Sequence, residues 1–155
     1  MVNPKGLTIT DFLLETPAPY IDFMSQVHDQ LSHAKHKAAF QIRKYGFTAQ
    51  YTSPLTKRLA LQFYANDGTL YMYVYSGFIY RHTDLFHLLP PHMRDTLEAS
   101  HNCTSCGSSC ATKHPCTING KQYNKCLNGR TLFTINDEVV TILPVLSEIC
   151  KTLHR

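Results

Sequence analysis

Five of the six cysteines of this chain fall within a stretch of 24 residues, from Cys103 to Cys126. The part between residues 101 and 115 is polar and has neither helical nor strand periodicity. Its small side chains cannot form a core of their own. The segment is therefore predicted to be a loop that needs an external restraint to fold.

The cysteine spacing favours a structural metal ion as that restraint. Cys103 and Cys106 have the C-x2-C spacing at which a turn directs two thiolates to one ion, and Cys110 follows within ligand reach. Cys126 completes the preferred set of four, because a turn at Asn119-Gly120 would fold the chain back toward the loop. A tetrahedral zinc site would supply the folding free energy that this loop lacks.

Several alternatives to this ligand set stay open. Cys116 enters the same hairpin and is an alternative to any one of the four, while His101 and His114 are potential substitutes. Cys103 and Cys106 can instead form a redox dithiol. Mobile thiols, adventitious disulfides and an iron–sulfur cluster are further options.

The chain is long enough for one compact domain. It has 155 residues, 43% of them apolar, so we expect a single domain over 1–155 that includes the cysteine-rich loop and hairpin at 101–126. No run reaches the roughly 18–20 apolar residues of a membrane span, and the N-terminus lacks an export signal. We expect a cytoplasmic protein without membrane association, which disfavours a disulfide framework.

The first half of the chain is predicted to form one helix and four strands. Apolar residues at spacings of three and four predict a helix over about Pro19 to Ser32. Alternating apolar residues on both sides of Tyr45-Gly46 predict two short strands. The clearest pattern surrounds Asn66-Asp67-Gly68, where alternation flanks a turn that tolerates positive φ and predicts a β-hairpin.

The second half is predicted to contain two short helices, at 81–89 and 91–100, then a hairpin over Thr117 to Tyr123 and a strand over Thr131 to Ile135. A final helix is expected to bury an apolar stripe in which Cys150 acts as a small hydrophobe. The stripe consists of Val140, Leu143, Leu146, Cys150 and Leu153. The fold class is therefore α+β, an antiparallel sheet packed with helices, plus a metal-clipped cysteine loop.

A row of tyrosines marks one side of the predicted hairpin. Tyr71, Tyr73 and Tyr75 share a face of the second strand, with Tyr64 across the hairpin. These rings could stack bases or form a protein interface. They could equally lie under a covering helix, because aromatic residues favour strands in any case.

The charge pattern gives little support to nucleic acid as a partner. The formal net charge is +4, but the basic residues occur in scattered pairs such as Arg43-Lys44 and Lys57-Arg58 and form no dense run. This pattern is typical of a solvated positive face. A protein partner, or self-association through the tyrosine face, is the alternative that we consider.

The nine histidines invite a catalytic interpretation. His82-x-Asp84, with His87 about one helical turn beyond His82, has the residues of a general base or a divalent metal site. No nucleophile elbow, glycine-rich phosphate loop or paired-histidine protease motif occurs in the sequence. We therefore assign no catalytic residue and interpret these histidines as solvated or capping groups.

Part of the chain resembles small uncharacterised cysteine-containing proteins of low-GC Gram-positive bacteria. The runs TINGKQYNKC at 117–126 and LFTINDE at 132–138 are similar to the F-T-x-x-G-K-x-Y-x-K-C segment that those proteins combine with an upstream C-x3-C. TKRLA at 56–60 looks similar too, so the likeness covers about Lys35 to Leu153. The order of elements is distantly similar to YdhG-like proteins, some of which are described as iron-handling.

This resemblance implies a ligand set but no activity. It carries over Cys106, Cys110 and Cys126, with Cys103 as the counterpart of a less regularly spaced fourth cysteine. The chain departs from the pattern at Cys116, where an aromatic residue is usual, and at Arg130, where a further cysteine often follows. These departures leave the exact ligand set undecided.

The sequence therefore favours a non-catalytic, zinc-stabilised domain that binds a partner through its sheet face or through a cleft beside the cysteine loop. The alternative class is a thiol-redox protein or metal-dependent enzyme, centred on Cys103 and Cys106 or on His82 and Asp84. A closed site with four protein ligands would indicate the first class. An accessible thiolate or an open metal position would indicate the second.

Overall fold

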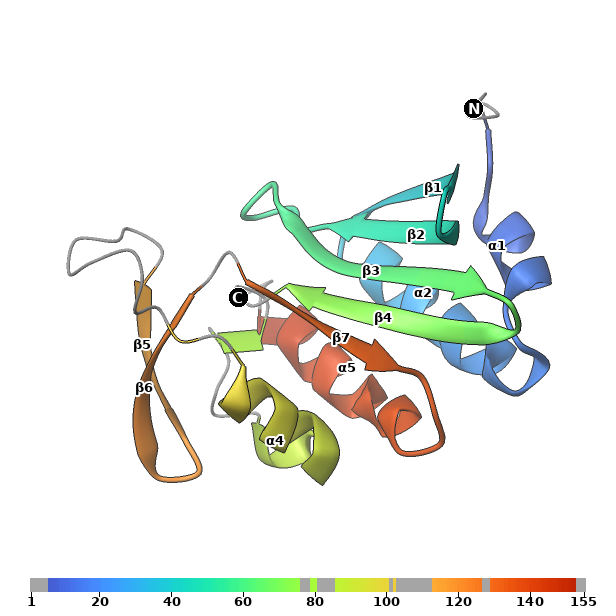
Figure 1. Ribbon diagram of the computed structural model, residues 1–155. Coiled ribbons are helices and arrows are strands. Elements are labelled where there is room, and N and C mark those ends of the chain that lie inside the picture. The colour runs from blue at the N-terminus through green and yellow to red at the C-terminus, as the bar shows by residue number, and fades with distance from the viewer. Residues whose placement is uncertain are drawn as a thin grey trace.

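The computed structural model describes residues 6–75, 79–80, 86–100, 102, 113–126 and 129–152, with the backbone alone for 149–152. It contains a five-stranded antiparallel sheet with helices packed against it, and a separate two-stranded hairpin (Figure 1). The predicted α+β class and antiparallel sheet are confirmed. No helix in the described ranges is long and apolar enough to cross a membrane.

The five-stranded sheet has the order β1-β2-β3-β4-β7. Its first four strands are consecutive in the chain and join through short turns, while the fifth returns from the C-terminal part to pair with β4. The strands are β1 (Lys37–Arg43), β2 (Gly46–Thr52), β3 (Leu59–Asn66), β4 (Thr69–Tyr75) and β7 (Arg130–Thr134). Both strand pairs predicted in the first half of the chain are thus confirmed, as is the later strand.

Two turns of the sheet depend on positive φ. Asp67 and Gly68, between β3 and β4, have φ of 48° and 73°, as a two-residue hairpin of the I′ type requires. Gly46, at the start of β2, has φ of 121°, and a Cβ there would overlap the backbone carbonyl oxygen of Ala65 on β3. Only glycine fits at this close approach.

Three helices cover one face of the sheet (Figure 1). The predicted first helix is confirmed as α2 (Ile21–His33), which follows a 3₁₀ turn, η1 (Ala18–Tyr20). Helix α1 (Ile9–Glu15) was not predicted from the sequence. Its start is capped, because Asp11 accepts hydrogen bonds from the backbone N–H and the hydroxyl of Thr8. The third helix, α5 (Leu143–Thr152), packs beside α2.

The core lies between this helical layer and the sheet. The Phe63 ring of β3 is completely buried and meets Phe23 of α2 and Tyr51 of β2 edge-on, with centroids 6.3 and 6.2 Å away. The Phe12 ring of α1 packs in the same manner against Phe47, at 5.7 Å. Apolar burial therefore holds α1 and α2 against β2 and β3.

The final helix buries a stripe that differs from the predicted one. It begins with a 3₁₀ turn, η3 (Val139–Ile142), which advances about 120° per residue instead of 100° and so shifts the buried face. Val140 and Leu143 are only partly buried, and the side chains of Cys150 and Leu153 lie outside the described residues. The buried positions are Val139, Ile142, Val145 and Leu146.

The second sheet is the hairpin of β5 (Lys113–Ile118) and β6 (Lys121–Cys126). Helix α4 (Pro91–Ala99), which confirms the predicted helix at 91–100, lies between this hairpin and the edge strand β7 (Figure 1). The expectation that residues 101–115 form a loop was wrong at its end, because the chain at 113–115 pairs with β6. Most of the helix expected at 81–89 lies outside the described residues.

Candidate functional site

The sheet presents one face that the described helices leave uncovered. Because successive side chains of a strand point to opposite faces, the residues between the core positions share this second face. We call it the open face. It includes Gln50, Gln62, Tyr64, Tyr71, Tyr73, Tyr75, Arg130 and Leu132.

The tyrosines of the open face form a stacked row. The Tyr64 ring lies 4.6 Å from Tyr71 and 5.9 Å from Tyr73 between centroids, at interplanar angles of 16° and 29°. The guanidinium group of Arg130 lies 4.8 Å from the centroid of Tyr73 and extends the row. All three rings are partly exposed. Of the two interpretations left open by the sequence, burial under a helix does not hold for the described part of the chain.

The surroundings of Tyr64, in the middle of this row, favour its protonated hydroxyl group. Partial burial raises the pKa of Tyr64 above its ordinary value of 10.0. The neighbouring Tyr73 and Tyr71 raise it further, by smaller amounts. Beside the row, the Gln50 side-chain amide donates a 3.0 Å hydrogen bond to the side-chain oxygen of Gln62 on the next strand. The middle of the open face is thus aromatic and polar but uncharged.

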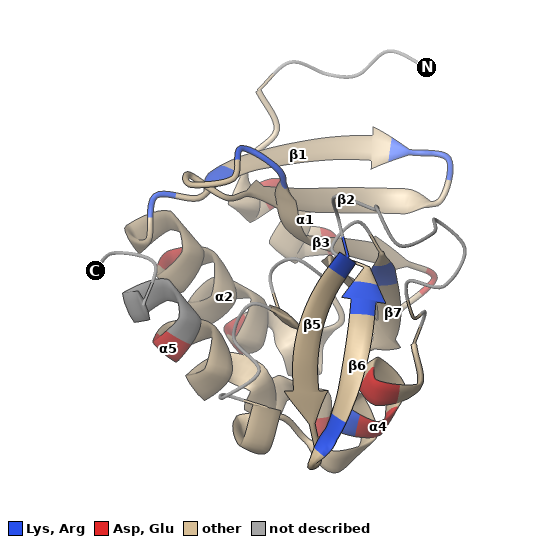
Figure 2. Ribbon diagram, turned by 90° about the vertical axis from the view of Figure 1, so that its left-hand side faces the viewer, with Lys and Arg blue, Asp and Glu red and all other residues tan. Residues whose placement is uncertain are grey.

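Charge is distributed unevenly between the sheet and the helices. The segments 37–75 and 130–134 contain six basic residues and one acidic residue, Asp67. Most acidic residues in the described part of the chain lie on the helices instead (Figure 2). The basic residues are Lys37, Arg43, Lys44, Lys57, Arg58 and Arg130. The sheet therefore has a positive border and a neutral centre.

The hairpin is attached to α4 by a buried lysine. The Lys125 side chain is fully buried, and its Nζ atom donates hydrogen bonds to the backbone oxygens of Glu98 and of Ser100, the latter at 2.8 Å. These carbonyls lie at the C-terminal end of α4, where a helix has unsatisfied acceptors and favours a cation. The Nζ atom also lies 4.9 Å from the centroid of the Tyr123 ring.

Glu98 attaches the turn of the hairpin, and Tyr123 on β6, to the same helix. Its carboxylate accepts hydrogen bonds from the Tyr123 hydroxyl at 2.5 Å and from the Asn119 side-chain amide at 2.7 Å. These bonds lower the pKa of Glu98, that from Tyr123 most. Burial lowers the pKa of Lys125, whereas the interactions with Cys116 and Glu98 raise it and partly offset the effect of burial. The sequence did not predict this cluster, because no local pattern marks it.

The register of the hairpin separates its two cysteines. Cys116 pairs with Tyr123 and faces α4, whereas Cys126 pairs with Lys113. The two pairs lie three residues apart along β5, a distance of about 10 Å. An odd spacing along a strand also places Cys116 and Cys126 on opposite faces of the hairpin. Zinc–sulfur bonds measure about 2.3 Å, so two cysteines on one ion have sulfurs less than about 4.6 Å apart. A ligand set that contains both Cys116 and Cys126 is incompatible with this register.

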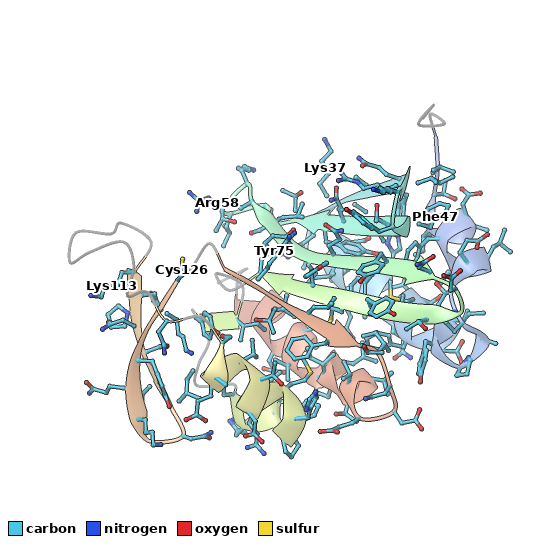
Figure 3. The ribbon with its side chains drawn as sticks, in the orientation of Figure 1. Lys37, Phe47, Arg58, Tyr75, Lys113 and Cys126 are labelled. Atoms are coloured by element: carbon cyan, nitrogen blue, oxygen red, sulfur yellow. The ribbon has the colours of Figure 1, made fainter. Side chains whose placement is uncertain are left out.

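Both ends of the segment 103–112 are attached next to Cys126. Asn102 forms a β-bridge with Lys125, the residue before Cys126, and Lys113 pairs with Cys126 itself. Figure 3 shows Lys113 and Cys126 at the same end of the hairpin. The chain that contains Cys103, Cys106 and Cys110 therefore leaves from, and returns to, the neighbourhood of Cys126.

Cys116 has the properties of an inert thiol. Partial burial raises the pKa of Cys116, although Lys125 acts in the opposite direction. The residue lines a pocket on the hairpin, together with residues that include Pro115, Tyr123 and Asn124. A thiol with a raised pKa is mostly protonated at neutral pH and is a weak nucleophile.

The remaining predicted site residues lie outside the described part of the chain. They are Cys103, Cys106, Cys110, His82 and Asp84. Among the residues that are described, no three His, Cys, Asp or Glu side chains come together as metal ligands would.

Comparison with known proteins identifies no relative. No family model, no curated protein and no solved structure matches this chain.

Proposed function

We propose that this chain is a non-catalytic binding domain, which presents the open face of its sheet to a partner and is stabilised by one structural zinc ion at the cysteine loop. The observation that carries the proposal is the open face. Its aromatic row combines stacked, partly exposed rings with an exposed arginine on regular strands. Rigid aromatic surface with few competing charges is typical of binding sites.

The attachment of the cysteine segment supports the zinc site. Asn102 and Lys113 bring both ends of 103–112 next to Cys126, so that four cysteines need no long-range rearrangement to approach one ion. We propose Cys103, Cys106, Cys110 and Cys126 as the ligands, with Cys116 as the alternative to Cys126. Zinc binding would then stabilise a segment whose side chains provide no core.

The metal is tested by native mass spectrometry with elemental analysis on freshly reduced protein, with and without chelator. We expect one zinc per chain, and we expect its removal to lower the melting temperature. Cys126→Ser should abolish stoichiometric binding, whereas Cys116→Ser, the matched control on the opposite face of the same hairpin, should retain it. Metal-free protein with unchanged stability, or a reversible Cys103–Cys106 disulfide, would contradict the zinc proposal and favour the thiol-redox alternative.

The binding surface is tested by replacing Tyr71, Tyr73 and Tyr75 with serine in one variant. We expect circular dichroism to show a folded protein that no longer binds its partner. Unfolding of this variant would indicate a core role for the tyrosines and would contradict the proposal.

A further inference from the structure

The open face is aromatic in its middle and positively charged at its border, and we propose that it binds single-stranded nucleic acid. This inference rests on the proposed function, because it assigns a ligand class to the same surface. It differs from the expectation based on charge pattern along the sequence, because Lys37, Lys57-Arg58 and Arg130 are scattered in the chain but lie at one end of the sheet, while the pair Arg43-Lys44 lies at the other end.

The stacked row supplies the contacts that unpaired bases need. Tyr71, Tyr64 and Tyr73 follow one another across β3 and β4, and the Arg130 guanidinium continues the row. Every base has a π face, so a base can stack, with little regard to sequence, on a ring or guanidinium plane that its neighbours in the row leave free. Each such contact typically contributes about 5- to 150-fold in affinity.

One end of the sheet supplies contacts for phosphates. Lys37 begins β1 opposite Thr52, and Arg130 pairs with Tyr75 at the end of β4, so that both lie at the end where β2 leads into β3. The connection from β2 to β3 adds Lys57 and Arg58 there. Figure 3 shows Arg58 and Tyr75 at this end of the sheet, with Phe47 at the other.

The connection that carries Lys57 and Arg58 is held in one conformation. The Ser53 backbone N–H donates to the Arg58 carbonyl at 2.9 Å, and the Lys57 N–H donates to the Ser53 carbonyl at 3.1 Å. The Ser53 hydroxyl also accepts hydrogen bonds from two backbone N–H groups inside the turn, those of Leu55 and Thr56. These hydrogen bonds hold the backbone from which the Lys57 and Arg58 side chains extend, at the end of the sheet where β2 leads into β3.

The separation of rings from charges favours a single strand over other anionic partners. In a single strand the bases and the phosphates are also separate, so the bases can occupy the neutral middle while phosphates reach the basic end. A duplex keeps its bases paired and requires a helix or ribbon that enters a groove, whereas the open face is a sheet surface. An acidic peptide would place carboxylates over uncharged rings.

Fluorescence anisotropy with the full chain tests this inference. The probes are fluorescein-labelled 12-nucleotide RNA and DNA single strands of mixed sequence, the corresponding duplexes, and labelled polyglutamate. We expect the single strands to bind at least tenfold more tightly than the duplexes. Lys37, Lys57, Arg58 and Arg130 are the four cations at the basic end of the sheet. If all four contact phosphates, the affinity should fall about fiftyfold between 50 and 200 mM salt, because the logarithm of the affinity changes by about −0.7 per contact for each unit of the logarithm of salt concentration.

Variants separate stacking from other contacts. Tyr73→Ser should weaken binding about tenfold, whereas Tyr73→Phe, which keeps the ring, should change it less than twofold. Tyr45→Ser is the control, since Tyr45 is 69% exposed in the turn between β1 and β2, away from the stacked row. Arg130→Gln should reduce the salt slope, and Arg94→Gln on α4 should not. Circular dichroism checks that each variant folds.

Three results would overturn the inference. The first is the absence of single-strand binding at 50 mM salt with protein at about 100 μM, the weak limit for non-specific binding. The second is an equal loss for Tyr73→Phe and Tyr73→Ser, which would indicate recognition through the hydroxyl. The third is tighter binding of polyglutamate that also depends on Tyr73, in which case the binding-domain proposal stands and only the ligand class fails. The zinc measurement is independent of all three.

Discussion

The sheet with its helical layer and the hairpin β5–β6 are stabilised by different interactions. In the first region, α2 and the sheet bury large apolar side chains such as Phe63 and Met72 completely. In the second, a buried lysine, a carboxylate and a tyrosine hydroxyl attach the hairpin to α4. Apolar burial is not directional and tolerates adjustment, whereas each polar contact depends on a specific partner. The sheet region should therefore determine global stability and the hairpin should open separately.

The largest effect is expected from a change in the core of the sheet region. Phe63→Ala removes a ring that touches Phe23 and Tyr51, and should lower the free energy of unfolding by about 3–5 kcal/mol. Urea denaturation followed by circular dichroism measures this. Tyr64→Ala, one residue along on the open face, is the matched control and should cost about 1–2 kcal/mol. Equal costs for the two would show that the open face is buried in solution.

The next effect compares one residue type in the two regions. Gly46→Ala places a Cβ against the Ala65 carbonyl of β3 at positive φ, and should cost about 3 kcal/mol of unfolding free energy. Gly120→Ala, in the hairpin turn at φ 77°, meets nothing within 4 Å and should cost only about 1 kcal/mol. Urea denaturation of both variants gives the comparison. A larger cost at Gly120 would contradict the assignment of global stability to the sheet region.

A third change should open the hairpin alone. Lys125→Met keeps much of the buried volume but leaves the carbonyls of Glu98 and Ser100 without their donor, at a cost of about 1–3 kcal/mol. Amide hydrogen exchange should become about tenfold faster in β5 and β6 and should stay unchanged in β3. Lys121→Met at the exposed start of β6 is the control and should change hydrogen exchange much less, because Lys121 contributes only a weak charge interaction with Glu98. Equal acceleration in β3 would show that the two regions unfold together.

The smallest effect is a dependence of hairpin opening on pH. The hydrogen bonds from Tyr123 and Asn119 hold the pKa of Glu98 below its ordinary value of 4.5. Because the folded pKa is the lower one, this contribution is fully present above pH 4.5 and is lost as the pH falls through the folded pKa. Hydrogen exchange of β5 and β6, corrected for intrinsic rates, should therefore show weaker protection in acid.

Two variants isolate the Glu98 contribution. Glu98→Gln cannot ionise at this position and should reduce the acid-dependent loss of hairpin protection. The pKa of Asp11 in the sheet region is lowered too, by its hydrogen bonds with Thr8, so Asp11→Asn is the control that should leave the hairpin unaffected. The same acid dependence in wild type and Glu98→Gln would show that another group controls hairpin opening.

Local patterns were sufficient for most elements of the sheet. The turn at Asn66-Asp67-Gly68 was predicted because it combines alternation with residues that adopt positive φ, and both properties act between near neighbours. Helix α1 was missed because it is only seven residues long, too short for a clear periodic pattern. The capping pair Thr8 and Asp11 was the signal that could have revealed it.

The candidate surfaces were less accessible to sequence reasoning. Alternation showed that Tyr71, Tyr73 and Tyr75 share a face, but it could not tell whether helices cover that face. The pairing of Lys125 with the end of α4 joins residues more than 20 positions apart and has no local signature. The separation of Cys116 from Cys126 depends on the strand register, which the turn residues suggested only in outline.

The sequence by itself determined the α+β class, the positions of the hairpin turns and the face of β4 that carries the tyrosines, because these follow from periodicity and from the φ preferences of single residues. Only the tertiary structure decided which face of the sheet the helices cover, how Lys37, Lys57-Arg58 and Arg130 come to lie at one end of it, and how Lys125 attaches the hairpin to α4. These properties depend on contacts between segments far apart in the chain, and such contacts leave no periodic pattern in the sequence.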